Sequence, residues 1–157
     1  FGEKRELLGA VAAVGFGLLR QRLLAATAMI GAVDTALSAF GSAYLDFAVG
    51  NPALYRLMFG PALAVGHSAR PTSALAAGAE TKTILEGILR RGAISGVFAI
   101  DPDDAGAREM GHLAVWSALH GLAMLIIDQK AEVDLPAETL LAGVLQRVLN
   151  GILISRS

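Results

Sequence analysis

The stretch from Met110 to Ile127 constrains the fold more than any other part of the chain. It holds the single tryptophan and two of the three histidines, and no charged residue lies between Glu109 and Asp128. As an α-helix it is apolar on two opposite sides, because a helix brings positions three and four apart onto one face. Such a helix lies between two packing layers, either its own domain and a partner or its own domain and lipid. The two stripes are His112–Trp116–Ala123–Ile127, with His120 at its edge, and Ala114–Ala118–Gly121–Leu125.

Composition favours a protein partner over lipid as the second packing layer of this helix. The chain has 157 residues, which fits one domain; 54% of them are hydrophobic and the mean hydropathy is +0.56. A membrane-spanning helix needs about 20 predominantly apolar residues. The opening stretch is borderline in length and is interrupted by Ser117 and its histidines. We therefore expect a helical protein that buries a second apolar surface in an oligomer.

Charge and cysteine content exclude several classes of protein. The net charge is −1 and the basic residues form no long stripe, so this segment is not expected to grip nucleic acid by itself. The absence of cysteine excludes disulfides and cysteine-ligated zinc. The chain begins with Phe1, which indicates a processed start or a fragment, and Glu3 and Glu6 argue against a signal peptide.

Periodicity and helix-ending residues predict an all-α fold of six helices, since no sustained alternation of polar and apolar residues marks a strand. Asp34 and Asn51 are expected as N-caps, and Asp103 and Asp104 in the first turn of the fifth helix. The first helix contains three glycines, each costing about 1 kcal/mol relative to alanine, so we expect it to bend or break. The expected helices are Glu3–Met29, Asp34–Gly50, Asn51–Gly60, Thr72–Gly92, Asp101–Ile127 and a last one beginning at Pro136.

The sixth helix is apolar over more than half of its circumference, whereas a surface helix of a monomer has a narrower apolar face. Together with the fifth helix it forms an antiparallel hairpin. Two such hairpins, paired across a two-fold axis, make a four-helix bundle, so we expect a homodimer. The expected interface residues are Ala114, Ala118, Gly121, Leu125, Leu141, Val144, Leu145, Val148 and Ile152.

Enzyme and metal signatures are weak. The segment GFGLLR at 15–20 imitates a dinucleotide fingerprint, but it sits inside a helix and has Arg20 in place of the third glycine. GHSAR at 66–70 lacks the second glycine of a nucleophile elbow. His112 and His120 are about 12 Å apart along a helix, too far to share a metal ion. We expect no catalytic residues, no metal and no cofactor.

Three segments resemble the TetR family of bacterial transcriptional regulators. FGEKRELL at 1–8 resembles the junction where the recognition helix ends and the linking helix begins. AYLDFAVGNPALYRLMFGP at 43–61 resembles the middle of the ligand-binding domain in one subgroup, and AVWSALHGLA at 114–123 resembles the Trp–His–Gly signature of that subgroup.

The resemblance implies that residues 1–157 form the effector-binding and dimerisation domain of a cytoplasmic, ligand-responsive regulator, most simply a repressor. The family's helix-turn-helix module is absent and should precede Phe1, so operator DNA would be bound only through that module. Lys4 matches the position that commonly touches a DNA phosphate in the family, which positions a protein without reading bases; its alternative is a solvated charge.

An effector pocket is expected between the middle helices, mostly apolar with a few orienting polar groups, and suited to a small hydrophobic molecule. Each of these residues has the alternative of being ordinary core. The expected lining is Phe40, Tyr44, Phe47, Tyr55, Met58, Phe59, Ile84, Ile88, Met110, Trp116 and His120.

Two other functions remain open at the level of sequence. One is a helical module that binds hydrophobic ligands and has no DNA function, such as a carrier. The other is a small membrane protein. The sequence upstream of Phe1 distinguishes the hydrophobic-ligand module from the regulator. Dependence on detergent would indicate a membrane protein.

Overall fold

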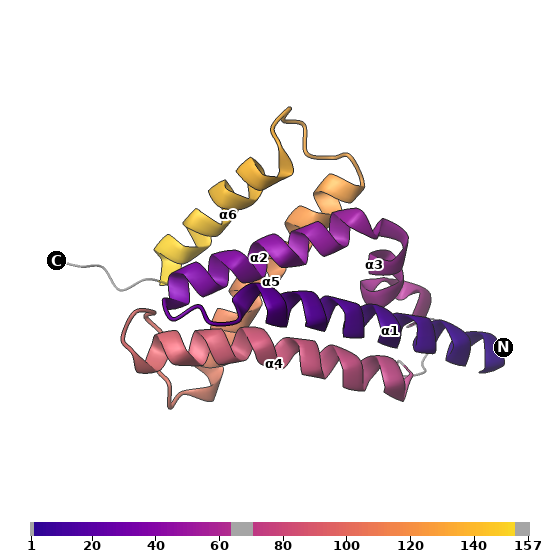
Figure 1. The fold of residues 1–157 in the computed structure, drawn as a ribbon, viewed down its shortest axis with the longest axis horizontal. Helices are drawn as coiled ribbons and strands as arrows, with labels where there is room; N and C mark the ends of the chain where they lie inside the picture. The colour runs from indigo at the N-terminus through magenta and orange to yellow at the C-terminus, as the bar shows by residue number, and fades with distance from the viewer. Residues whose placement is uncertain (1, 64–70, 153–157) are drawn as a thin grey trace.

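The computed structural model describes residues 2–63 and 71–152, and every regular element in these ranges is a helix, which confirms the all-α prediction. Phe1, His67 and the 66–70 segment lie outside the described residues. The elements are α1 (Gly2–Thr27), α2 (Val33–Gly50), α3 (Pro52–Phe59), the short 3-10 helix η1 (Pro61–Leu63), α4 (Thr72–Ile94), α5 (Ala105–Ile127) and α6 (Ala137–Ile152) (Figure 1).

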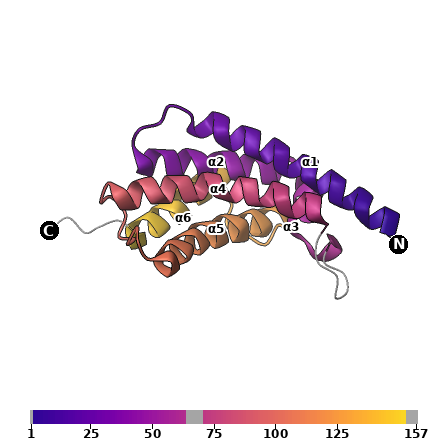
Figure 2. The ribbon, with the colours of Figure 1, turned by 90° about the horizontal axis from the view of Figure 1, so that it is seen from below.

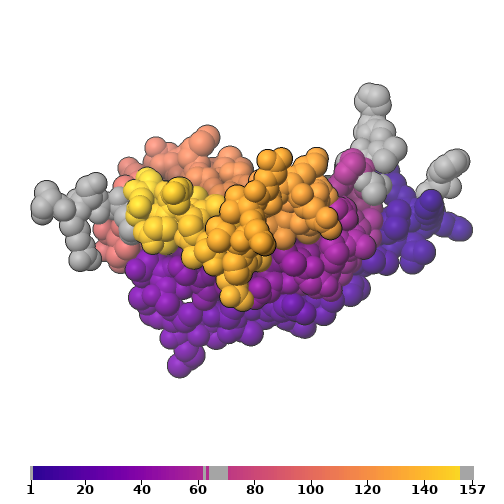
Figure 3. Space-filling view, turned by 90° about the horizontal axis from the view of Figure 1, so that it is seen from above, coloured from indigo at the N-terminus to yellow at the C-terminus, as the bar shows by residue number. Residues whose placement is uncertain are grey.

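The helices pack in an order that differs from their order in the chain. α1 and α4 lie side by side and run in the same direction, and α2 packs against both in the opposite direction (Figures 1 and 2). α5 contacts α2 and α4, and α6 folds back on α5 and α2. A space-filling view shows α6 and the end of α5 together on one surface, above α2 (Figure 3). The middle helices α2, α4 and α5 therefore enclose the centre of the domain.

α1 is one continuous helix, so the expected break does not occur. Gly17 faces open space, but Gly9 and Gly15 lie where neighbours come close: a Cβ at Gly15 would be 2.6 Å from Sδ of Met58 and 2.9 Å from Cδ1 of Leu54, both on α3. The missing side chain lets α3 approach α1, and the packing that results outweighs the helix propensity that glycine costs. The buried face of α1 consists of Gly9, Ala12, Gly15, Phe16, Leu19 and Leu23.

Some helices start at residues other than the expected ones, because several polar residues near a start all favour the N-terminus of a helix. α5 begins at Ala105, after Asp101 and Asp103, and Asp104 is its N-cap: the carboxylate accepts from the amides of Gly106 (2.8 Å) and Ala107 (3.1 Å). Ala32, and not Asp34, occupies the N-cap of α2. Asn51 does precede α3, but its side-chain amide donates to the carbonyl of Phe47 (3.0 Å) and caps nothing in α3.

The apolar band of α6 divides into an inner and an outer part. Leu141, Leu145 and Leu149 are buried inside the protomer. A Cβ at Gly41 on α2 would be 2.6 Å from Cδ1 of Leu145, so this glycine lets α6 dock closely on α2. Leu141 and Leu145, which we expected at the dimer interface, therefore pack in the core of one chain, because i and i+4 positions fall on its inner face.

Two helices, α1 and α5, are long and apolar enough to cross a membrane by length and composition. Both pack against other helices of the domain, and the core helices of soluble proteins satisfy the same criteria. They are weak support for the membrane alternative.

Candidate functional site

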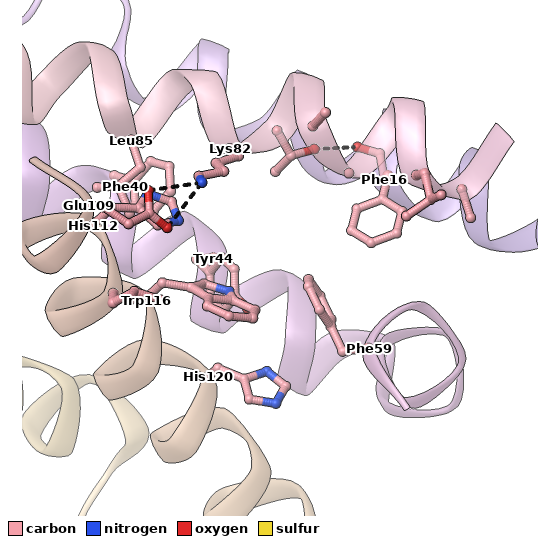
Figure 4. A pocket seen from close by; sticks show the side chains of 16 residues that line it. Phe16, Phe40, Tyr44, Phe59, Lys82, Leu85, Glu109, His112, Trp116 and His120 are labelled. Carbon is pink, nitrogen blue, oxygen red and sulfur yellow. Dashed lines mark hydrogen bonds and ion pairs between the residues drawn. The ribbon is translucent and has the colours of Figure 1, made fainter. Parts of the chain in front are cut away.

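A cavity of about 400 Å³ lies at the centre of the domain, between α1, α2, α3, α4 and α5 (Figure 4). This volume is in the range of small-molecule sites. Most of its walls are aromatic or small apolar side chains. Its lining consists of Phe16, Phe40, Tyr44, Phe59, Ala74, Leu75, Gly78, Ala79, Thr81, Lys82, Leu85, Glu109, His112, Leu113, Trp116 and His120.

Five residues expected at the pocket line this cavity, and six lie elsewhere. Phe47 and Met58 are buried in the core. Tyr55 is fully buried behind the wall, where it contacts two lining side chains. Ile84 and Ile88 lie at a separate hollow beside α1, and Met110 is 67% exposed at the surface. The five that line it are Phe40, Tyr44, Phe59, Trp116 and His120.

The lining that sequence reasoning missed comes mainly from α1 and α4. Phe16 projects from α1 into one end of the cavity (Figure 4), and Thr81 on α4 approaches its backbone, with a hydroxyl-to-carbonyl distance of 3.5 Å. The face of α4 that lines the cavity carries small and charged residues. The prediction relied on hydrophobic residues and therefore chose the wrong face of this helix. The signal that was available is the spacing of Ala74, Gly78 and Leu85, which share one side of a helix.

A chain of four polar aromatic side chains forms one wall. Nε1 of Trp116 donates to the hydroxyl of Tyr44 (3.2 Å), which lies 2.7 Å from the hydroxyl of Tyr55. The Tyr55 hydroxyl lies 2.6 Å from Nδ1 of His120. Because an indole nitrogen can only donate, every proton finds an acceptor if Tyr44 donates to Tyr55 and Tyr55 donates to His120. This order assigns the proton of neutral His120 to Nε2.

Burial keeps this chain uncharged. It raises the pKa of Tyr44 to about 12 and raises the pKa of Tyr55 further, and it lowers the pKa of His120. All three side chains are therefore neutral near pH 7, which suits a wall that contacts an apolar molecule.

The opposite end of the cavity is polar (Figure 4). Nζ of Lys82 donates to both carboxylate oxygens of Glu109 (3.2 and 3.1 Å) and lies 3.4 Å from a carboxylate oxygen of Glu86. The hydrogen bond with Glu109 raises the pKa of Lys82. These side chains are partly exposed, so the network contributes little to stability but fixes the charges at this end.

His112 lies beside this ion pair and is only 6% exposed. Within the described part of the chain, its Nδ1 is buried without a hydrogen-bond partner. Burial, and then the positive charge of Lys82, lower the pKa of His112. A neutral imidazole with an unpartnered, buried nitrogen therefore belongs to the polar end of a largely apolar cavity.

The His112–Trp116–His120 side of α5 faces the interior, as the stripe pattern predicts. For the opposite side of α5, the small residues of its stripe also predict close packing on the sixth helix. This prediction is wrong at Gly121, where a Cβ would have no neighbour within 4 Å. Ala114 and Leu125 are exposed and Ala118 is partly exposed. Of the other expected interface residues, Val144, Val148 and Ile152 are half-buried on α6.

Lys4 is exposed in the first turn of α1, at the end of the domain opposite the last turn of α6 (Figure 1). Across residues 2–63 and 71–152, no three histidine, aspartate or glutamate side chains gather as a metal site would require.

The chain has counterparts among known proteins. The model of the tetracyclin repressor-like C-terminal domain matches residues 37–148. The chain belongs to this family. The matched segment runs from α2 into α6, so it contains every wall of the cavity except Phe16 on α1.

A solved structure has a similar fold. It is the structure of a protein with unknown function from Rhodococcus sp. RHA1, with a TM-score of 0.82 and 19% identity, over 94% of this chain and 74% of that one. At this identity the likeness shows the fold alone. A comparison with curated proteins gives no match.

Proposed function

We propose that this chain is the effector-binding and dimerisation part of a ligand-responsive transcriptional regulator, acting as a cytoplasmic repressor. Family membership and the central cavity support this proposal. The observation that carries it is that Phe16, on α1, lines the cavity, while the start of α1 is where the DNA-binding module would attach. We also assign the chain to the subgroup named for Trp116, His120 and Gly121.

The proposed mechanism uses α1 as the link between effector and DNA. A small hydrophobic molecule in the cavity contacts Phe16 on α1 and Leu85 and Gly78 on α4, and favours one relative position of the two helices. It can shift the equilibrium only by its difference in affinity for the two positions. In a dimer, the DNA-reading heads have to match half-sites about 34 Å apart, so a small pivot of α1 weakens operator binding. Lys4 then adds a phosphate contact near the start of α1.

The test uses the full-length protein with its upstream segment. We expect that segment to encode a helix-turn-helix, and we expect binding to DNA from its own promoter region to weaken when a hydrophobic effector is added. Phe16→Ala should uncouple the two events: effector binding persists, while its influence on DNA affinity falls. A plain methionine start just before Phe1 would instead support a hydrophobic-ligand carrier without DNA function.

Dimerisation through α5 and α6 is the second part of the proposal. α6 and the end of α5 lie together on one surface (Figure 3). Because α5 carries an exposed stripe and α6 carries half-buried valines, we infer that a second copy packs there. Gly121→Leu fills space that is open in the single chain, so we expect it to disrupt the dimer while leaving the protomer folded. Gly87→Leu, on α4, is the matched control because Gly87 also faces open space.

Analytical ultracentrifugation measures the outcome. We expect the parent chain and Gly87→Leu to sediment as dimers and Gly121→Leu to dissociate at micromolar concentration. A Gly121→Leu variant that stays fully dimeric would remove this surface from the interface.

A further inference from the structure

We propose that the cavity takes a flat, uncharged apolar molecule carrying a hydroxyl group, and that this hydroxyl hydrogen-bonds Nδ1 of His112. This inference rests on the proposed function, in which the cavity is the effector site, and it names the chemical class of the effector. Three independent features of the described residues lead to it.

The first feature is the unpartnered nitrogen. Nδ1 of His112 is buried, and none of the described residues satisfies it. A buried polar group without a hydrogen bond costs about 1–3 kcal/mol, so structures rarely keep one without a reason. His112 lines the cavity, and Figure 4 shows it at the end where Lys82 and Glu109 meet. We infer that a ligand group at this end, where the His112 ring lines the cavity, becomes the partner of the nitrogen.

The second feature is the charge around His112. Among the described residues, Lys82 is the cation whose charge acts on His112, and the carboxylates of Glu109 and Glu86 are already paired with it. A carboxylate on the ligand would face these two carboxylates. An ammonium on the ligand would have to displace Lys82 from Glu109, which accepts from Nζ through both oxygens. A neutral polar group on the ligand is neither repelled by these carboxylates nor required to displace Lys82.

A hydroxyl is the neutral group that suits His112 best. It both donates and accepts, so it satisfies Nδ1 in either neutral tautomer. Burial lowers the pKa of His112 and keeps the imidazole neutral, which is the form that such a group requires.

The third feature is the shape of the aromatic wall. The rings of His112 and Trp116 lie 6.4 Å apart with an interplanar angle of 25°, and those of Trp116 and His120 lie 5.6 Å apart at 31°. Three rings that follow one another along α5, each tilted relative to the next, offer their faces and edges to a flat molecule, and Phe16 and Phe59 lie at the far end (Figure 4). Offset or edge contacts with such rings favour a planar aromatic body.

The test uses four probes that share the biphenyl ring system and differ in the group at its 4-position: biphenyl, 4-phenylphenol, biphenyl-4-carboxylate and 4-phenylbenzylammonium. Isothermal titration calorimetry on the full-length protein measures each dissociation constant. We expect 4-phenylphenol to bind roughly threefold to tenfold more tightly than biphenyl, the gain from one hydrogen bond. Both charged probes should bind more weakly than 4-phenylphenol.

His112→Phe keeps a ring in the wall and removes Nδ1. We expect it to abolish the preference for 4-phenylphenol over biphenyl. Leu113→Ala, at a neighbouring lining position, should weaken all four probes alike and keep the preference. Thermal unfolding of both variants confirms that they are folded.

A measurement on the unaltered protein avoids dependence on the variants. The ¹⁵N resonance of Nδ1 in His112 should shift when 4-phenylphenol is added and stay in place with biphenyl. Equal binding of all four probes, or tightest binding of a charged one, would overturn the hydroxyl assignment and leave the effector pocket intact. If none of the four binds, the cavity is not an effector site for flat molecules of this size, and the pocket proposal falls with it.

Discussion

The phenol oxygen of Tyr55, on α3, lies 2.6 Å from Nδ1 of His120, on α5, although 65 positions separate them in the chain. The same oxygen lies 2.7 Å from the Tyr44 hydroxyl on α2. One buried hydroxyl thus joins three helices behind the cavity wall, and the rigidity of that wall depends on it.

Tyr55→Phe removes this hydroxyl, so the hydroxyl proton of Tyr44 loses its acceptor and Nδ1 of His120 loses its donor. We expect the free energy of unfolding to fall by about 1–3 kcal/mol, measured by urea denaturation. Ser38→Ala is the control, because its hydroxyl is exposed and donates only to the carbonyl of Asp34; it should change stability by less than about 0.5 kcal/mol.

Tyr44→Phe should cost a similar amount, because Nε1 of Trp116 loses its acceptor. The double variant should cost less than the sum of the two, since both remove the bond between the hydroxyls. Strict additivity would show that the two tyrosines do not act as one network.

Stability should fall on mild acidification. Burial lowers the folded-state pKa of His112 and His120 below the unfolded value of about 6.5. Between these values the unfolded chain binds more protons than the folded one, so stability rises with pH and is fully present above about pH 6.5. Urea denaturation between pH 7.5 and 5.5 should show a slope of at most about 1.4 kcal/mol per pH unit for each histidine.

The variants His112→Phe and His120→Phe assign this slope, and they separate the two residues from His67. Each should flatten the dependence in part. A slope that is unchanged in both variants would contradict the assignment, as would a protein that gains stability on acidification.

Gly41→Ala should destabilise the domain, because the new Cβ would lie 2.6 Å from Cδ1 of Leu145 and 3.2 Å from Cδ2 of Leu119. Forcing these side chains aside costs about 1–3 kcal/mol. Gly87→Ala is the opposite case: it faces open space within α4 and should stabilise by about 0.5–1 kcal/mol through helix propensity. Thermal denaturation compares the two, and a Gly41→Ala variant as stable as Gly87→Ala would show that α6 shifts freely on α2.

Asp104→Ala removes the cap of α5. We expect a loss of about 1 kcal/mol in urea denaturation, because the amides of Gly106 and Ala107 lose their acceptor. Asp103→Ala tests whether any acidic residue near the start of α5 stabilises the helix as Asp104 does. The backbone amide of Asp103 donates to the carboxylate of Asp101, and this bond does not depend on the Asp103 side chain, so the stability of Asp103→Ala should stay within about 0.5 kcal/mol of the parent.

Sequence patterns predicted the helices well and their starts less well. Periodicity placed all six, and the two stripes of α5 correctly oriented His112 and Trp116 toward the interior. Asp101, Asp103 and Asp104 all favour a helix start by charge, so the pattern could not separate them. Only three-dimensional geometry shows that Asp104 reaches the free amides.

The cavity was harder to predict because its walls depend on which faces meet. Ile84 and Ile88 are among the most hydrophobic residues in the second half of α4, yet they face another hollow, beside Arg20 and Leu24. Phe16 was missed because nothing in α1 alone indicates that it reaches across to α4. Its contribution follows from the parallel packing of two helices far apart in the chain, which periodicity does not encode.

Trp116 is the chain's one tryptophan, and it lines the cavity between two imidazoles while its indole nitrogen is bound to Tyr44. Its fluorescence therefore arises from a single chromophore inside the site. Emission wavelength and quenching report directly on polarity and contacts there, without an attached dye. The protein carries its own optical probe for screening the molecules that enter it.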